Sequence, residues 1–179
     1  MAIEIERRFL VDGRNEKPWR EGVSKEISQF YLRDVSLVDG SLFYQNLHIM
    51  DIDENLQDIV TWRIRNYAGT YILTAKGRKI RAAGTEFEWE VSEKLWAKLS
   101  NSGLPGIRKT RYLYENNDGM LWEIDEYEGI LAGLIIAEVE LESEEQSIEI
   151  PEWTRLELTN LRGWSNAALS NMIKDADSN

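Results

Sequence analysis

The sequence lacks cysteine and contains a single histidine, His48. Without cysteine there is no disulfide framework, no thiolate zinc site and no cysteine nucleophile. With only one histidine in the chain, no serine–histidine–aspartate set competes as a catalytic arrangement. Candidate functional groups must therefore be sought among the charged side chains.

Long apolar runs are also absent. The first residues, MAIEIERRFLV, carry charges where a secretory signal needs an apolar stretch, and no segment approaches the ~18 apolar residues of a membrane-spanning helix. Basic residues are in the minority, with 21 Lys and Arg against 32 Asp and Glu, which gives a formal net charge of −11. This balance argues against nucleic acid or an anionic membrane as the main partner. We expect a soluble, cytoplasmic protein.

The acidic balance does not exclude an anionic ligand, because a local basic cluster can dominate within a Debye length of ~8 Å. The length of 179 residues and the apolar content of 42% suit one domain, residues 1–179, with a sizeable core. A homodimer stays open.

Most of the chain has the pattern of short strands joined by turns. Strands are expected over residues 3–11, 26–33, 60–66, 70–76, 84–91, 109–115, 120–127 and 134–142, and helices over 93–100 and 165–176. Residues 34–59 are acidic and weakly patterned, which indicates a surface excursion or a hairpin. The sequence therefore predicts a mainly β (α+β) fold, an eight-stranded antiparallel barrel with a few external helices.

Several of the expected strands carry like charges two residues apart, with an apolar or β-branched residue between them. Residues i and i+2 of a strand share a face, so each segment presents a charged row and an opposite, more apolar row. Such rows occur at Glu4-Ile5-Glu6, Arg63-Ile64-Arg65, Glu86-Phe87-Glu88-Trp89-Glu90, Lys109-Thr110-Arg111, Glu123-Ile124-Asp125 and Glu138-Val139-Glu140-Leu141-Glu142.

Acidic and basic rows lie on separate strands, as they would if they faced each other across an enclosed space. An interior lined by both signs suits a metal ion together with a polyanion. The alternative is an ordinary sheet whose charged face is solvated, with Glu4 and Glu6 in surface ion pairs. We expect Trp62, Trp89 and Trp122, opposite the charged rows, to pack in the core.

The ordered set of motifs resembles the CYTH superfamily of triphosphate tunnel metalloenzymes. Glu4 to Arg8 is similar to its ExExK signature, and the pair Arg63 and Arg65 to the basic pair of its third strand. Further along, Thr74-Ala75-Lys76 looks like its T-x-K, Glu86 to Glu90 like its acidic strand, and Lys109 to Tyr112 like its K-x-R-Y. Glu123-Ile124-Asp125, Glu138-Val139-Glu140 and Trp164 to Leu169 are similar to its E-x-D, E-x-E and Y-x-N-x-x-L motifs.

Two departures from that pattern matter. Arg8 stands where the family has lysine, and arginine can grip phosphate but cannot readily donate a proton at neutral pH. Gly163-Trp164 replaces the usual Arg-Tyr pair, so no site residue is carried over from that segment.

The resemblance implies a tunnel that binds a triphosphate and a divalent cation, Mg²⁺ or Mn²⁺. Its substrate-binding residues would be Arg8, Arg63, Arg65, Lys76, Lys109 and Arg111. Its metal ligands would be Glu4, Glu6, Glu138 and Glu140, with Asp125, Glu88 and Glu90 as further candidates. Catalysis would involve Glu4, Glu6, Arg8, Lys76 and Asp125. Glu86 and Glu142, at row ends, and the turn residues Arg78, Lys79 and Arg81 are expected at the solvated surface.

The function predicted from the resemblance is metal-dependent hydrolysis of a triphosphate, with tripolyphosphate as first choice because nothing in the sequence marks a base- or thiamine-binding pocket. A thiamine-triphosphatase or a class IV adenylyl cyclase stays open within the family. A sensor that binds polyphosphate or a nucleotide without turnover is the non-enzymatic alternative.

Overall fold

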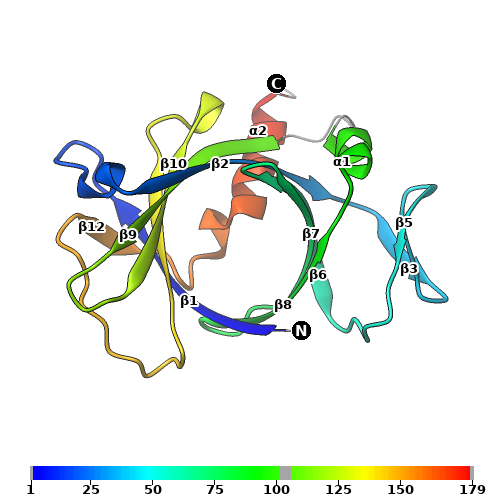
Figure 1. The fold of residues 1–179 in the computed structure, drawn as a ribbon, viewed down its shortest axis with the longest axis horizontal. Coiled ribbons are helices and arrows are strands. Elements are labelled where there is room, and N and C mark those ends of the chain that lie inside the picture. Colours follow the sequence, from blue (N-terminus) through cyan, green and yellow to red (C-terminus); the bar gives the residue numbers. More distant parts are fainter. Residues whose placement is uncertain (1, 101–105, 178–179) are drawn as a thin grey trace.

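The computed structural model describes residues 2–100 and 106–177. Its central feature is a closed antiparallel barrel whose eight strands follow the order β11-β10-β9-β2-β6-β7-β8-β1 and close through the pairing of β1 with β11 (Figure 1). The barrel strands are β1 (Ala2–Val11), β2 (Val23–Leu32), β6 (Ile59–Tyr67), β7 (Thr70–Gly77), β8 (Ala83–Glu90), β9 (Gly106–Glu115), β10 (Leu121–Tyr127) and β11 (Ile135–Glu140). The predicted barrel is confirmed.

Smaller elements surround the barrel. A separate three-stranded sheet contains β3 (Val35–Val38), β4 (Ser41–Tyr44) and β5 (Leu47–Asp51), and a short strand β12 (Thr154–Glu157) pairs with the end of β1. The helices are α1 (Glu93–Ser100) and α2 (Asn166–Asp177), with three short 3₁₀ turns, η1 (Pro18–Glu21), η2 (Gly129–Leu131) and η3 (Arg162–Trp164). Neither α-helix of the described chain is long and apolar enough to cross a membrane.

The apolar residues of the alternating strands pack outside the barrel, so that its charged rows face inward. On one side Phe9, Trp122 and Val139 form a cluster that η1 and the segment before β12 cover with Trp19 and Trp153. Burying each large apolar side chain contributes about 1.5–3 kcal/mol. The outer face therefore holds much of the hydrophobic core, and the lumen is left to polar groups.

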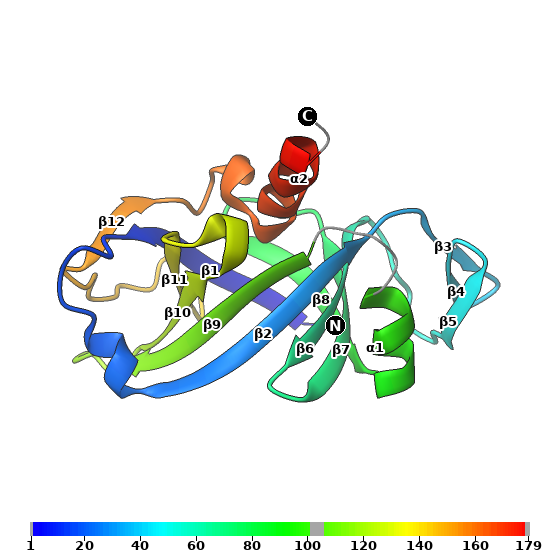
Figure 2. The same ribbon diagram turned by 90° about the horizontal axis from the view of Figure 1, so that it is seen from above.

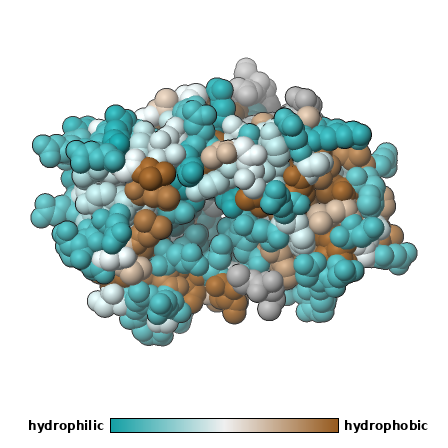
Figure 3. All heavy atoms as spheres, viewed as in Figure 1, coloured by the Kyte–Doolittle hydropathy of each residue, from teal (hydrophilic) through white to brown (hydrophobic). Residues whose placement is uncertain are grey.

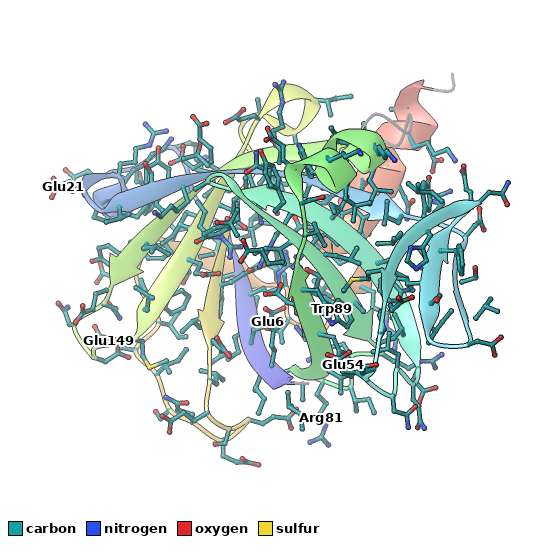
Figure 4. All side chains as sticks on the ribbon, turned by 45° about the vertical axis from the view of Figure 1, so that its right-hand side comes forward. Glu6, Glu21, Glu54, Arg81, Trp89 and Glu149 are labelled. Carbon is teal, nitrogen blue, oxygen red and sulfur yellow. The ribbon has the colours of Figure 1, made fainter. Side chains whose placement is uncertain are left out.

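The opposite outer face is covered by α1 and the three-stranded sheet. Leu99 of α1 and Leu42 of β4 are fully buried against Ile64 and Leu73 of the barrel. The indole of Trp89 donates a hydrogen bond to Glu54, 3.2 Å away, and thereby ties the segment after β5 to β8 (Figure 4). Residues 34–59 are thus a small sheet that extends the core, where the sequence indicated an excursion or a hairpin.

The helix α2 lies across one end of the barrel (Figures 1 and 2). Its residue Leu169 is buried in a cluster with Ile107, Tyr127 and Ile136, which come from three different barrel strands. These three strand positions belong to the inward rows, so the lumen is apolar at this end. The helix and this cluster together close one end of the lumen.

Gly22 immediately precedes β2 and lies close to the backbone of β9. A Cβ at this position would lie 2.3 Å from the backbone oxygen of Leu113, which cannot move aside as a flexible side chain would. We expect Gly22→Ala to lower the free energy of unfolding by about 1–3 kcal/mol. Chemical denaturation measures this change. Gly163→Ala, where the added Cβ meets nothing within 4 Å, is the control and should stay within about 0.5 kcal/mol.

Candidate active site in the barrel lumen

Ion pairs inside the barrel join strands that are not neighbours. Glu4 on β1 meets Lys76 on β7 at 3.3 Å, and Arg63 on β6 meets Glu86 on β8 at 3.3 Å. Side chains can reach past an intervening strand in this way only where they converge on the concave inner face. The charged rows predicted from the sequence therefore line a common lumen.

The deepest ionic cluster surrounds Asp125 of β10, which is fully buried. Arg111 of β9 grips both of its oxygens, with Nε 2.7 Å from Oδ1 and Nη2 2.8 Å from Oδ2, and Lys109 bonds the same carboxylate. Arg111 also reaches Glu138 at 3.2 Å, and Arg8 reaches the other oxygen of Glu138 at 2.7 Å. Three cations from β1 and β9 are thus held in fixed positions by two carboxylates.

A second cluster lies on β6, β7 and β8. Glu88 accepts hydrogen bonds from Arg65 at 2.9 Å and from the Thr74 hydroxyl at 3.0 Å, and it lies 3.5 Å from Arg63. Glu86 pairs with Arg63 and with Lys76. These contacts hold the predicted substrate-binding pair, Arg63 and Arg65, with their guanidinium groups on the lumen side.

Burial and charge shift the acid–base properties of these groups. Burial, supported by a hydrogen bond with Glu4, raises the pKa of Glu86 to about 8 against the charges of Lys76 and Arg63. Burial likewise lowers the pKa of Lys109 to about 8, although Asp125 opposes the shift. For Glu138, burial acts to raise the pKa, but Arg8 and Arg111 outweigh it and hold the pKa well below its ordinary value.

Three buried guanidinium nitrogens have no hydrogen-bond partner among residues 2–100 and 106–177: Nη2 of Arg8, Nε of Arg63 and Nε of Arg65. A buried charged donor without an acceptor costs free energy. All three belong to residues predicted to bind substrate. The lumen therefore has donors available for an anion that would enter it.

The carboxylates predicted as the main metal ligands lie on two adjoining strands, β1 and β11. Glu6 of β1 stands directly opposite Glu140 of β11, and Arg8 stands opposite Glu138. Like charges directly opposite in a sheet destabilise it unless a cation intervenes. Here Lys79 approaches Glu6 at 2.6 Å, while Glu140 and Glu90 are exposed.

No group of three or more carboxylate or histidine side chains in the described part of the chain is gathered closely enough to hold a metal. Glu4, Glu6 and Glu138 are each held by a lysine or arginine instead. Oxygen donors on neighbouring strands suit a hard divalent cation in kind. To bind such a cation, these carboxylates would have to release the lysine and arginine side chains that hold them.

The lumen end opposite α2 is open and polar. Figure 3 shows a hollow near the middle of this face, largely surrounded by hydrophilic residues. In Figure 4, Glu6 lies among the side chains at the centre of the barrel, whereas Glu21 and Glu149 lie at its periphery. A ligand therefore has one polar entrance to the cationic clusters.

Several lumen groups differ from expectation or were missed. Glu86, expected at the solvated surface, is buried because its strand position points into the lumen, and Lys79 turns inward to Glu6. The Gln29 amide on β2 donates a hydrogen bond to the Tyr31 hydroxyl at 2.8 Å. Both side chains are uncharged, so a search for charged rows could not identify them. The carbonyl of Trp164, which accepts a hydrogen bond from Arg8 at 3.1 Å, is a backbone group and has no sequence signature.

Arg8 contacts Glu138 through Nε and the Trp164 carbonyl through Nη1, whereas a lysine would have to make both contacts from its single Nζ. We expect Arg8→Lys to lose about 1–2 kcal/mol of stability, since each hydrogen bond contributes about 1 kcal/mol. For a chain of this size the melting temperature then falls by about 2–8 °C. Calorimetry measures the melting temperature, with the exposed substitution Arg162→Lys as the control. A melting temperature of Arg8→Lys equal to that of the wild type would show that the two contacts of Arg8 do not stabilise the fold.

Known proteins resemble this chain in both sequence and fold. The sequence model of the CYTH domain matches residues 2–167. An Acetivibrio thermocellus protein named inorganic triphosphatase is 29% identical over 179 residues, 98% of this chain and 96% of that protein. A Nitrosomonas europaea protein of the same name is 30% identical over 119 residues, 63% of this chain and 76% of that protein. A crystal structure described as an inorganic triphosphatase matches with a TM-score of 0.61 and 26% identity, covering 95% of each chain.

Proposed function

This chain belongs to the CYTH domain family, and from that premise we propose that it hydrolyses inorganic triphosphate inside the barrel with the help of a divalent cation. The observation that carries the proposal is the set of buried guanidinium donors on Arg8, Arg63 and Arg65 that find no acceptor in the described part of the chain. A compact polyanion would supply acceptors to all three. The names of the two relatives favour inorganic triphosphate as that polyanion.

The basic residues would bind and align the phosphate chain. Arginine suits geometric recognition of phosphate oxygens, and Arg63 and Arg65 present two guanidinium groups side by side on β6. Arg8, Lys109 and Arg111 form the deeper group near the closed end. Lys76, which lies between Glu4 and Glu86, would be attracted to the negatively charged triphosphate.

The cation would be held by Glu4, Glu6, Glu138 and Glu140, with Asp125, Glu88 and Glu90 as further candidates, and Mg²⁺ and Mn²⁺ both suit these oxygen donors. When bound, it supplies positive charge against the phosphoryl oxygens. The opposite placement of Glu6 and Glu140 on β1 and β11 fits such a group.

The catalytic contribution of the protein would be preorganised charge, without a covalent nucleophile. Glu88, which is partly exposed and close to both Arg63 and Arg65, is suited to orient an attacking water. Asp125 is saturated by Arg111 and Lys109, so its part would be to fix these cations. For Asp125 we therefore favour this positioning role over the roles of catalytic group and metal ligand that the sequence predicted.

The test is phosphate release from tripolyphosphate, ATP, thiamine triphosphate and pyrophosphate, each with Mg²⁺, Mn²⁺ or EDTA. We expect rapid release from tripolyphosphate that EDTA abolishes. Release from thiamine triphosphate at a higher kcat/KM would identify a thiamine-triphosphatase, and cyclic AMP from ATP would identify a cyclase. Thermal stabilisation by tripolyphosphate without turnover on any substrate would overturn the enzyme and leave a sensor.

A further inference from the structure

A second cavity lies outside the lumen, beside the closed end of the barrel. Its volume is about 620 Å³, within the usual range for small-molecule sites. It lies between the turn after β1, the 3₁₀ turn η1, the junction of β10 with β11, and β12. Its lining residues are Leu10, Val11, Asp12, Gly13, Arg14, Lys17, Arg20, Glu126, Tyr127, Gly133, Leu134, Ile135 and Arg155.

Four of the six charged lining residues are cations, in a chain whose net charge is −11. The two carboxylates are covered, since the side chains of Asp12 and Glu126 are 9% and 16% exposed. The guanidinium groups that cover them are far more accessible, at 89% for Arg14, 49% for Arg20 and 45% for Arg155. The accessible charge of the cavity is therefore positive.

Both carboxylates fix arginines in place. Asp12 receives two hydrogen bonds from Arg14, at 2.9 and 2.8 Å, and lies 3.6 Å from Arg155. Glu126 receives the indole hydrogen bond of Trp19 at 2.9 Å and a two-pronged contact from Arg20. Guanidinium groups held in this way lose little side-chain entropy when an anion binds.

Lys17 adds a fourth cation to the lining, and against the effect of burial its charge helps, after the hydrogen bonds from Arg20 and Trp19, to hold the pKa of Glu126 below its ordinary value. It is half-buried, and its stem passes over Gly13, whose ideal Cβ would lie 3.8 Å from the lysine Cε. Glu16 and Glu21, the acids on either side of Lys17, do not line the cavity, and Glu21 lies at the outer edge of the molecule (Figure 4).

A wall of apolar side chains separates this cavity from the lumen. Tyr127 lines the cavity, and its ring also faces Lys109 of the lumen, whose Nζ is 5.8 Å from the ring centroid. Leu10 and Leu134 line the cavity and also pack in the cluster that closes the barrel. An anion in the cavity would thus be distinct from one in the lumen.

We propose that this cavity is a second anion site, which takes a compact phosphate-class anion such as orthophosphate or pyrophosphate. Three arginines and a lysine around one hollow suit a small ligand with several oxygens, because arginine binds phosphate oxygens in pairs. A monocarboxylate could engage only part of this set. The site stands whether or not the lumen hydrolyses triphosphate, since it shares none of the proposed catalytic residues.

The test follows the amide resonances of Gly13 and Gly133, which line the cavity, during titration with pyrophosphate, orthophosphate and acetate in EDTA. We expect saturable shifts with pyrophosphate or orthophosphate and much weaker ones with acetate. In the variant Arg14→Gln/Lys17→Gln the dissociation constant should rise at least about tenfold. Two exposed lysines of α1, changed in Lys94→Gln/Lys98→Gln, give the same loss of charge and should leave it unaltered.

A lumen variant, Arg63→Gln/Arg65→Gln, separates the two sites. Retained binding at Gly13 and Gly133 in this variant supports a separate site, and loss of it would assign the anion to the lumen and overturn the proposal. If the α1 control weakened anion binding as much as Arg14→Gln/Lys17→Gln, or if the shifts did not saturate, the effect would be general ionic attraction. Either result would overturn the proposal too. Measuring phosphate release from tripolyphosphate with Arg14→Gln/Lys17→Gln shows independently whether the lumen activity exists.

Discussion

Replacing Arg111 with alanine is expected to reduce tripolyphosphate hydrolysis by at least about 100-fold and to destabilise the fold by about 3–5 kcal/mol. Arg111 is 7% exposed and contacts Asp125, Glu138 and Glu123 at once. Without it, three carboxylates share the remaining positive charge of Lys109 and Arg8. Breaking a buried ion pair from one side leaves charge uncompensated, and this cost exceeds the net contribution of the pair itself.

Two measurements separate these effects. Urea denaturation gives the loss of stability, and single-turnover kinetics on the folded fraction give the loss of activity. Arg111→Lys keeps the charge but cannot bridge three carboxylates, so it should fold and still lose a large part of its activity. Arg108→Ala, on the exposed face of the same strand, is the matched control. Turnover at the wild-type rate in folded Arg111→Lys and Arg111→Ala would remove Arg111 from the site.

The double variant Glu4→Gln/Glu6→Gln is expected to lose metal-dependent turnover by at least about 100-fold. Both side chains point into the lumen, where Lys76 and Lys79 neutralise them. Amides keep the shape but give up the negative charge that would hold a divalent cation. The same change leaves two lysines free of their acids, so tripolyphosphate should bind at least as tightly in EDTA as it does to the wild type.

Activity and ligand binding are therefore expected to move in opposite directions. Phosphate release is measured over a range of Mn²⁺ concentrations, and thermal shift with tripolyphosphate in EDTA reports binding. The exposed pair Glu16→Gln/Glu21→Gln makes the same change in net charge elsewhere. If the lumen variant kept its turnover, or lost tripolyphosphate binding together with it, the metal assignment to β1 would be wrong.

Much of the barrel could be predicted because charge and apolarity alternate with the period of a strand. Arg63-Ile64-Arg65 shows why: Ile64 is fully buried in the outer core, and both arginines turn into the lumen. The helix Glu93–Ser100 was predicted with its bounds, since Ser92 precedes a segment whose apolar residues recur at helical spacing.

Other features depend on contacts that no local pattern encodes. Glu86 looked like the end of a row, yet it is 6% exposed because β7 and β6 bring Lys76 and Arg63 to it. The sheet of residues 35–51 has short strands with weak alternation, and its order comes from packing on the barrel through Leu42 and Tyr44. The second cavity arises where residues far apart in sequence, such as Arg14 and Arg155, meet at one carboxylate.

The closure of β1 on β11 also bears on how the chain folds during synthesis. Arg8 pairs with Glu138, so β1, the first barrel strand along the chain, must wait for β11, the last strand of the barrel. Contacts of such sequence separation are slow to form, because the loop entropy is lost before the pairing is gained. Until then both edges of the growing sheet stay open and its charged rows stay solvated. Glu4 and Glu6 on the open edge strand β1 are then expected to discourage pairing between unfinished chains, because like charges on two such edges repel each other.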